Sequence, residues 1–322
     1  MAKSAYEGRL DGHRAGITAL SFSEDGKKLL TASKDRTLCV WEVHEDTADG
    51  SSKNKKVPVA SAKRTLRGHS DVVSQAILES GGDFVLSSSW DRTVKLWTLD
   101  EKEDEACLRT FRGHRHQVNA VVWSPDHRII LTASCDRTVK VWNNLGECKF
   151  TLYDGDHKDW VTALAWSRDT DADYFLSASW DKTVKLWNTK DMKMLWEMKA
   201  HTGPVLAVAV SPDSKLGASG GSDRTILVLD LKGRCVAYAF AVDGIIRALD
   251  FNPREFWLAA ITEMSPSGRV RVFDLQTKTC LLGLSPPDQG LAGLAVKWHP
   301  QGRRLFGGFS DGSVHVWRSP AT

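Results

Sequence analysis

The chain has 322 residues and a mass of 35.7 kDa; 42% of its residues are hydrophobic and 26% are charged. This composition is typical of a soluble globular protein and excludes a chain that is disordered throughout. The 43 Lys and Arg residues against 40 Asp and Glu leave a net charge of +3. A charge field over the whole surface is thereby excluded, so any basic surface must be local.

The sequence offers no targeting or membrane signal. Its first ten residues lack the apolar stretch of a signal peptide, and the longest purely apolar run, Val205–Val210, is too short to cross a bilayer. The six cysteines include no Cys-x-x-Cys pair, which indicates reduced thiols. We therefore expect a cytoplasmic protein with no membrane span.

A repeated motif organises the chain. The pattern Asp-x-Thr-x-x-x-Trp occurs four times from Asp35 onward, and a fifth copy has Ser313 in place of the Thr. Two degenerate copies end at Leu229 and Phe273. The closing residues of the seven copies are 41, 97, 142, 187, 229, 273 and 317. A period in this range indicates one repeat architecture instead of two ordinary domains.

Each well-kept Asp has a histidine upstream of it, at a distance of 22 residues in four repeats and 24 in the fourth. We attribute the extra length of the fourth repeat to a short loop insertion at 168–173. Between these landmarks lie short β-rich stretches such as 118–123 and 129–134, bounded by turn residues. Each repeat therefore predicts an antiparallel sheet of about four strands, the unit of a β-propeller.

These residues resemble the WD40 family over essentially the whole sequence. The resemblance implies an all-β fold, a seven-bladed WD40 β-propeller of four-stranded antiparallel blades, in which residues 1–322 form a single domain. The repeats are expected at about 13–43, 69–99, 114–144, 157–189, 201–231, 243–275 and 291–317. The segment Tyr6–Leu10 is expected to supply the outer strand of the last blade and to close the ring.

In WD40 blades the turn Asp, the upstream His, a strand Ser or Thr and the strand-end Trp form a hydrogen-bonded group. A buried polar group left unpaired costs about 1–3 kcal/mol, which explains the fixed spacing. Spacing alone does not decide whether Thr31 or Ser33 joins the group. The group is expected for His13, Asp35, Trp41, His69, Asp91, Trp97, His114, Asp136, Trp142, His157, Asp181, Trp187, His201 and Asp223.

The fifth and sixth blades depart from this pattern. The fifth ends in Leu229 instead of Trp, and the sixth lacks both the His and the Asp. We expect these two blades to be held by packing alone.

Catalytic and metal sites are not predicted. The combination of His, Ser and Asp suggests a hydrolase triad, but it occurs five times, whereas a catalytic group needs one special copy. His114 and His116 are the only close histidine pair, and a zinc site needs three or four ligands. We therefore expect a protein that is not an enzyme, with no metal, no cofactor and no small-molecule substrate.

A local basic surface is predicted on the first two blades. Their connection, residues 44–67, is longer than the others and is expected to be a basic inter-blade loop. It holds six cations and no acid between Ser51 and Ser70. For Lys53, Lys55 and Lys56, a solvated flexible loop is an equally good interpretation. Arg64 and Arg67 of this connection, together with Lys34, Arg36 and Arg92 of the neighbouring turns, predict one phosphate-binding patch.

Two tryptophans stand out beside the turns. Trp90 and Trp180 directly precede the turn Asp of the second and fourth blades, where other blades have Lys34, Cys135 and Ser222. An exposed aromatic residue at this rim is typical of a protein-binding anchor. Packing on a neighbouring side chain is the alternative, and the sequence leaves both open.

Several stretches, among them 142–150, 157–161 and 244–258, resemble the receptors for activated C kinase. This resemblance implies a scaffold on the head of the small (40S) ribosomal subunit that contacts rRNA and ribosomal proteins. It also implies recruitment of signalling and quality-control proteins such as protein kinase C. The turn Lys34-Asp35-Arg36 stands where that family contacts RNA, with Arg64 and Arg67 at matching basic positions. Phe256 stands where many members carry a phosphorylatable Tyr, so that switch is expected to be absent.

The alternative is a cytosolic WD40 adaptor that does not bind ribosomes. A G-protein β subunit would carry a long N-terminal helix, which the 12 residues before His13 do not predict. A ubiquitin-ligase substrate receptor would typically show Trp-Asp-x-Arg at a repeat end, whereas Trp41 is followed by Glu and Trp97 by Thr.

Overall fold

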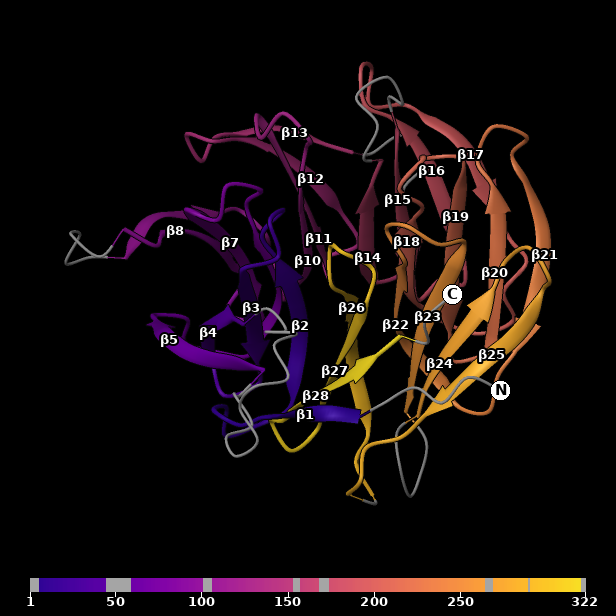
Figure 1. Cartoon of the computed structure of the whole chain (residues 1–322). Coiled ribbons are helices and arrows are strands. Elements are labelled where there is room, and N and C mark those ends of the chain that lie inside the picture. Colours follow the sequence, from indigo (N-terminus) through magenta and orange to yellow (C-terminus); the bar gives the residue numbers. More distant parts are fainter. Residues whose placement is uncertain are drawn as a thin grey trace, which may run out of the picture.

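The computed structural model describes residues 6–44, 59–100, 106–152, 157–167, 174–263, 269–288 and 290–319. Within them the chain forms seven four-stranded antiparallel sheets arranged as the blades of a propeller (Figure 1). The predicted all-β, seven-bladed fold is therefore confirmed. The basic residues Lys53, Lys55 and Lys56 and the insertion at 168–173 lie outside the described residues.

The blades follow one another in chain order, and each strand pairs with the next. Blades one to four contain β2 (Ile17–Phe22), β3 (Lys28–Ser33), β4 (Thr37–Val43) and β5 (Ala60–Arg67); β6 (Val73–Leu78), β7 (Phe84–Ser89), β8 (Thr93–Thr98) and β9 (Cys107–Arg112); β10 (Val118–Trp123), β11 (Ile129–Ser134), β12 (Val139–Asn143) and β13 (Cys148–Thr151); and β14 (Val161–Trp166), β15 (Tyr174–Ser179), β16 (Val184–Asn188) and β17 (Met194–Met198). Blades five to seven contain β18 (Val205–Val210), β19 (Leu216–Gly221), β20 (Thr225–Asp230) and β21 (Cys235–Ala241); β22 (Ile245–Phe251), β23 (Trp257–Glu263), β24 (Arg269–Asp274) and β25 (Thr279–Leu284); and β26 (Gly293–Trp298), β27 (Arg304–Phe309), β28 (Val314–Arg318) and β1 (Tyr6–Leu10).

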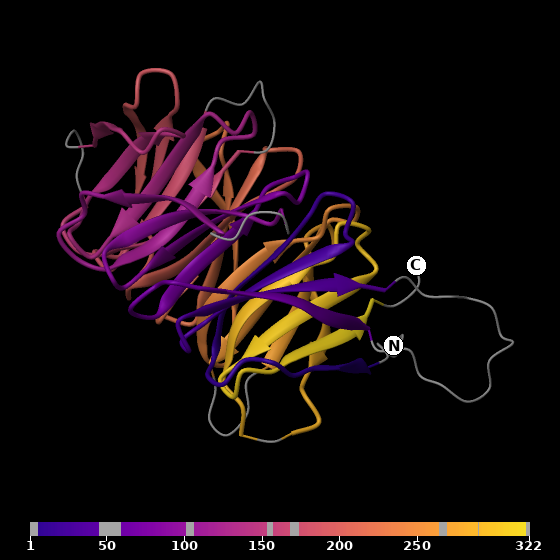
Figure 2. The same ribbon diagram turned by 90° about the vertical axis from the view of Figure 1, so that its left-hand side faces the viewer.

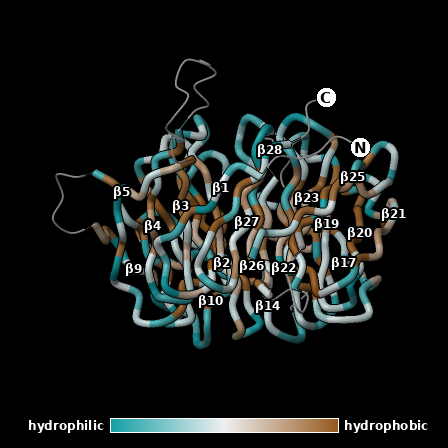
Figure 3. Tube along the Cα trace, turned by 60° about the horizontal axis from the view of Figure 1, so that its bottom comes forward, coloured by the Kyte–Doolittle hydropathy of each residue, from teal (hydrophilic) through white to brown (hydrophobic). Residues whose placement is uncertain are grey.

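The core lies between neighbouring blades. The second strand of every blade has five consecutive buried residues, because both of its faces pack against an adjacent sheet. One apolar cluster, for example, joins Leu30 and Val40 of blade one to Val85 and Trp97 of blade two. Hydrophobic residues accordingly concentrate in the strands, and hydrophilic ones in the turns at the two ends of the propeller (Figure 3). Blade-to-blade burial thus supplies the main stabilising term.

The N-terminal strand closes the ring as the sequence predicted. β1 pairs antiparallel with β28, with Tyr6 opposite Trp317 and Leu10 opposite Val314. Figures 1 and 2 show the indigo β1 beside the yellow strands of the last blade. Because this blade is assembled from both ends of the chain, opening the ring requires the loss of a complete strand pairing.

The predicted inter-blade loop at 44–67 is wrong for its second half. Ala60–Arg67 is β5, the outer strand of blade one, which pairs with β4 along its whole length. As an edge strand it buries only Ala60 and Leu66, so its sequence lacks the alternation of a half-buried strand. Its exposed Lys63 and Arg67 are typical of strands that avoid edge-to-edge pairing.

Hydrogen bonds between the innermost strands link the first four blades to their successors. A polar residue near the start of each innermost strand donates to the first carbonyl of the next blade's innermost strand. The donor–acceptor distances are 2.6–2.9 Å, for Thr18 to Val73, Ser74 to Val118, Asn119 to Val161 and Thr162 to Val205. The corresponding residues of blades five and seven are Leu206 and Leu294, which have no side-chain donor.

The described ranges contain no helical segment with the length and hydropathy of a membrane span. No group of three or more His, Cys, Asp and Glu residues in these ranges could hold a metal ion.

Candidate nucleic-acid interface

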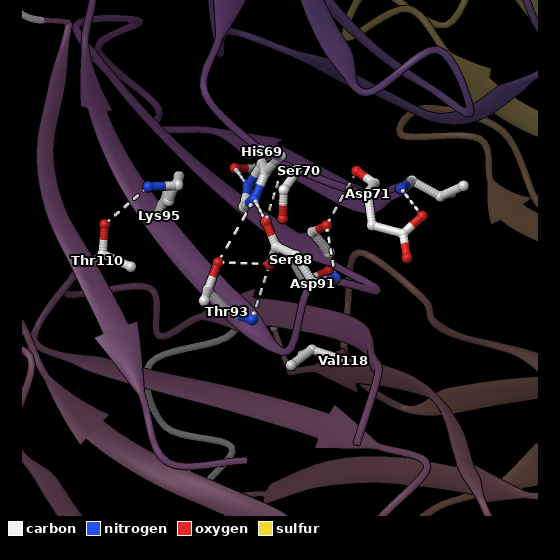
Figure 4. Close-up of polar contacts among 12 residues, drawn as sticks. His69, Ser70, Asp71, Ser88, Asp91, Thr93, Lys95, Thr110 and Val118 are labelled. Atoms are coloured by element: carbon white, nitrogen blue, oxygen red, sulfur yellow. Dashed lines mark hydrogen bonds and ion pairs between the residues drawn. The ribbon is translucent and has the colours of Figure 1, made fainter. Parts of the chain in front are cut away.

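A buried hydrogen-bonded group shapes the turn that follows the second strand of a blade. In blade two, His69 Nδ1 lies 2.7 Å from Asp91 Oδ2, and His69 Nε2 lies 2.7 Å from Ser87 Oγ (Figure 4 shows His69 and Asp91). Trp97 Nε1 donates to the same hydroxyl at 2.8 Å. The carboxylate can only accept, so His69 Nδ1–H donates to it and the Ser87 hydroxyl donates to Nε2. The group is therefore fully satisfied with a neutral imidazole.

The same set recurs in the other well-kept blades. Spacing did not decide between Thr31 and Ser33 in blade one. The structure shows that Thr31 joins the group, while the Ser33 hydroxyl donates to the carbonyl of Ala15. The complete groups are His13, Asp35, Thr31 and Trp41; His114, Asp136, Thr132 and Trp142; and His157, Asp181, Ser177 and Trp187. The five imidazoles, His201 included, are at most 2% exposed, so no substrate reaches them.

The expectation that packing alone holds the fifth blade is wrong. His201 lies 2.7 Å from Asp223 and 2.8 Å from Ser219, so this blade lacks only the contribution of the Trp. Leu229 fills that place and is fully buried. In the sixth blade, an ion pair between Arg271 and Asp243 accompanies the apolar packing. The regular 22-residue spacing from His201 to Asp223 already indicated the group of the fifth blade, whereas no repeated spacing indicated the ion pair of the sixth.

The turn Asp also fixes how the next residue is presented. Asp35 Oδ1 accepts the backbone N–H of Thr37, and the residue between them takes a left-handed conformation. Positive φ is uncommon outside Gly, Asn and Asp, yet five blades place a cation there. These cations are Arg36, Arg92, Arg137, Lys182 and Arg224, with φ between 61° and 71°, and all are exposed. We call this end of the propeller the Asp-turn end.

Four of the five predicted phosphate-binding residues gather at this end of the first two blades. Lys34 and Arg36 flank Asp35, and Arg67 pairs with Thr37, the next residue along. Arg92 occupies the same turn position in blade two as Arg36 in blade one. All four side chains are exposed.

Arg64 differs from the other four. It lies midway along β5, opposite Val40, and is only half-exposed. Its Nη1 donates to the carbonyl of Asp100 in blade two at 3.1 Å. Its position and this bond indicate a link between neighbouring blades.

Besides the turn residues Arg137, Lys182 and Arg224, three further cations at the Asp-turn end were not predicted. Arg14 and Arg115 directly follow a group histidine, and their backbone N–H groups donate to the Asp35 and Asp136 carboxylates. Arg112 pairs with Thr93, as Arg67 does with Thr37. Their positions in the repeat, directly after the group histidine or opposite the turn Thr, are the sequence signal that could have identified these three arginines. We define the basic patch as Arg14, Lys34, Arg36, Arg67, Arg92, Arg112 and Arg115, all of them exposed.

The basic patch is electrostatically uncompensated. Within the described ranges, none of its seven side chains makes an ion pair. At the same end of blades six and seven, by contrast, the arginines are neutralised. Arg9 contacts Asp11 and Asp288 at 2.6 Å and Asp311 at 3.1 Å. The first blades therefore present free positive charge at the Asp-turn end, unlike the surface around Arg9, and this charge suits an extended anion such as a nucleic-acid backbone.

The two predicted protein-binding tryptophans have different surroundings. Trp90 and Trp180 are 43% and 41% exposed. Trp180 packs on Trp160, a residue that the sequence analysis did not single out, with ring centroids 4.6 Å apart.

Comparison with known proteins gives consistent matches. The family model described as "WD domain, G-beta repeat" matches residues 5–42, 60–98, 105–143, 146–188, 192–230 and 279–318. The chain is 41% identical over 317 residues to the small ribosomal subunit protein RACK1 of Schizosaccharomyces pombe, covering 96% of both chains. It is 43% identical over 328 residues to the protein of that name from Medicago sativa, again with 96% of both chains covered. The cross-pathway control WD-repeat protein 2 of Flammulina velutipes is 39% identical over 320 residues, 97% of this chain and 96% of the relative.

Proposed function

Because the chain belongs to the WD40 family, and within it to the family of small ribosomal subunit proteins RACK1, we propose that it is a non-enzymatic scaffold of the small (40S) ribosomal subunit. It docks through the Asp-turn end of its first blades, on the head of the subunit. The basic patch contacts rRNA there, together with neighbouring ribosomal proteins. The observation that carries this proposal is the set of seven exposed cations with no ion pair among the described residues.

The chemistry of the patch favours phosphate. Six of its seven residues are arginines, whose planar guanidinium groups bind phosphate oxygens in pairs. The turn geometry holds Arg36 and Arg92 in a fixed backbone conformation, so less freedom is lost on docking. Phosphate contacts carry no sequence information, which suits a protein that binds one folded RNA surface by shape and charge.

A scaffold role agrees with the architecture. Blade-to-blade packing makes the propeller a rigid body, and its outer strands and second end stay available once one end has docked. Recruitment of signalling and quality-control proteins, protein kinase C among them, is part of the proposal through the family resemblance. Phe256 is 57% exposed and has no hydroxyl, so recruitment here does not use phosphorylation at that position. The protein would act in the cytoplasm, on ribosomes.

Co-sedimentation with purified small subunits tests the proposal. The variant Arg36→Asp reverses one charge of the basic patch, and Asp tolerates a positive φ. The matched control Arg224→Asp makes the same change at the same turn of blade five, at φ 61° against 69°. Losing a charge-assisted contact is expected to weaken binding by about tenfold or more for Arg36→Asp, with no change for the control. Equal effects of the two variants, or wild-type protein that stays free of the subunits, would contradict the proposal.

A further inference from the structure

Two exposed indoles pack against each other at the Asp-turn end of blade four. Trp160 lies in the loop that enters β14, and Trp180 lies in the turn after β15. Their ring centroids are 4.6 Å apart at an interplanar angle of 40°, yet 43% of Trp160 and 41% of Trp180 remain exposed. Two large aromatic side chains that stay half in water are typical of an interaction site.

The backbone brings these two positions together in every blade where both are described. In blade four, Trp180 N–H donates to the Trp160 carbonyl at 2.9 Å. The same bond joins Lys34 to Gly16, Trp90 to Val72, Cys135 to Gln117, Ser222 to Pro204 and Ser310 to Ala292. Blade four is the one among these that has an aromatic residue at both positions. The pairing is therefore a feature of its sequence, placed on a site that the fold repeats.

The pair is held in place locally. Trp160 N–H donates to Asp159 Oδ1 at 2.8 Å, and Lys158 N–H donates to the Asp181 carboxylate at 2.9 Å. Asp181 is in turn fixed by His157 in the buried group of this blade. A ligand that covers the indoles thus meets a preformed surface and loses little freedom in the protein.

Each indole has an exposed lysine close to it in the sequence. Lys158 lies two residues before Trp160, and Lys182 lies two residues after Trp180, with φ 70° and an exposed side chain. Neither lysine makes an ion pair with a described residue. The surface therefore combines an apolar anchor point with two exposed lysines that make no ion pair with a described residue.

We propose that Trp160 and Trp180, with Lys158 and Lys182 beside them, form a docking site for an acidic protein segment that carries one large apolar side chain. The apolar side chain covers the indoles and its acidic neighbours pair with the two lysines. This composition matches the buried aromatic anchors and charged rims of protein interfaces. The site is separate from the basic patch and does not depend on ribosome docking.

The observations favour a protein segment over single-stranded RNA. A run of stacked bases needs free indole faces, and here the two indoles pack against each other at an interplanar angle of 40°. A phosphate chain crossing the pair would also pass the half-exposed Asp159 carboxylate, which repels it. A peptide avoids both obstacles, because it places charge only where its acidic side chains lie.

The test uses the full chain labelled with 5-fluorotryptophan and followed by fluorine NMR. The resonances are assigned by their loss in Trp160→Phe and Trp180→Phe. The probes are blocked nonapeptides of Asp and Glu with a central Leu, Phe or Trp, the same peptides with a central Ser, and a ten-nucleotide uridine RNA. We expect the peptides with an apolar centre to shift both resonances at up to about 1 mM, and the Ser peptides to do so far less.

Variants identify the contacts. Trp180→Ala is expected to weaken binding of the apolar-centred peptide by about tenfold or more. The pair Lys158→Gln and Lys182→Asn keeps the indoles and removes the charge, and is expected to weaken binding and abolish its salt dependence. Trp90→Ala, at the same turn position of blade two, is the matched control and should leave peptide binding unchanged. Thermal unfolding curves verify that each variant folds.

Three results would overturn the proposal. They are no shift with any acidic peptide at the highest concentration, equal binding by wild type and Trp180→Ala, or a uridine-RNA affinity that exceeds that of the peptides. Failure of the proposed ribosome docking is recognised separately, because Trp180→Ala should co-sediment with small subunits as wild type does if both sites act as described.

Discussion

The role of the buried hydroxyl is tested by making one substitution in two blades. Ser87 in blade two serves two partners, His69 Nε2 and Trp97 Nε1. Ser219 in blade five has the same place in the repeat, but Leu229 replaces the Trp there, so the Ser219 hydroxyl contacts His201 and no indole. Both serines are fully buried, and Ser→Ala removes the same atom from each.

The difference between the two variants follows from the count of unpaired groups. Ser87→Ala leaves an indole N–H and an imidazole nitrogen without partners, whereas Ser219→Ala leaves one imidazole nitrogen. At about 1–3 kcal/mol for each unsatisfied buried group, we expect a loss of about 2–6 kcal/mol in blade two and about 1–3 kcal/mol in blade five. The lost volume is equal, so cavity costs largely cancel in the comparison.

Urea unfolding followed by circular dichroism measures both losses as shifts of the transition midpoint. Thr110→Val serves as the control, because this half-exposed outer-strand hydroxyl accepts from Lys95 Nζ and makes a long contact to Cys107 Sγ, and its loss should cost less than about 1 kcal/mol. Equal losses for Ser87→Ala and Ser219→Ala would refute the reasoning, and so would a larger loss for Ser219→Ala.

Three further outcomes are expected. Binding to small subunits should fall about 100-fold between 50 and 200 mM salt if roughly four phosphates are neutralised, as measured by gradient sedimentation; a flat response would exclude the basic patch as the docking face. Burial lowers the pKa of His157 below its usual 6.5, so the unfolded chain is protonated first and the free energy of unfolding should fall as the pH drops below about 6.5. Burial opposes ionisation of Asp91, but hydrogen bonds from His69 and Thr93 outweigh it and hold the pKa of Asp91 well below 3.8. The free energy of unfolding should therefore fall a second time below about pH 4. Urea midpoints that stay constant from pH 7.5 to 3.5 would contradict both assignments. Deleting residues 1–10 removes β1 and exposes the edge of β28, so we expect a lower thermal midpoint and association between molecules, detected by light scattering; an unchanged midpoint would argue against closure by this strand.

Much of the fold could be predicted from spacing. The fixed distance from His to Asp is a local constraint, since both residues lie in one blade and bond to each other. The closing strand was found because Tyr6–Leu10 precedes the first complete repeat and has the right position in the ring. The strand β5 was missed because an edge strand has little buried pattern, and its lysine and arginines resembled those of a loop.

The candidate site was only partly predictable. Sequence located Lys34, Arg36, Arg67 and Arg92 through their turns, but charge compensation depends on residues distant in the chain. Arg9 is neutralised by Asp288, 279 residues away, and no local pattern reveals this contact. The packing of Trp160 against Trp180 was likewise hidden, because it depends on a backbone bond between two loops.

The most direct measurement of the central claim is a cryo-electron-microscopy reconstruction of the protein bound to purified small ribosomal subunits. The account predicts that the Asp-turn end of the first blades faces the subunit, with Lys34, Arg36 and Arg92 within contact distance of rRNA phosphates. Blade four, with its tryptophan pair, should remain open to solvent. A reconstruction in which the opposite end or the ion-paired surface around Arg9 faces the RNA would contradict the account, as would subunits that carry no propeller at saturating protein.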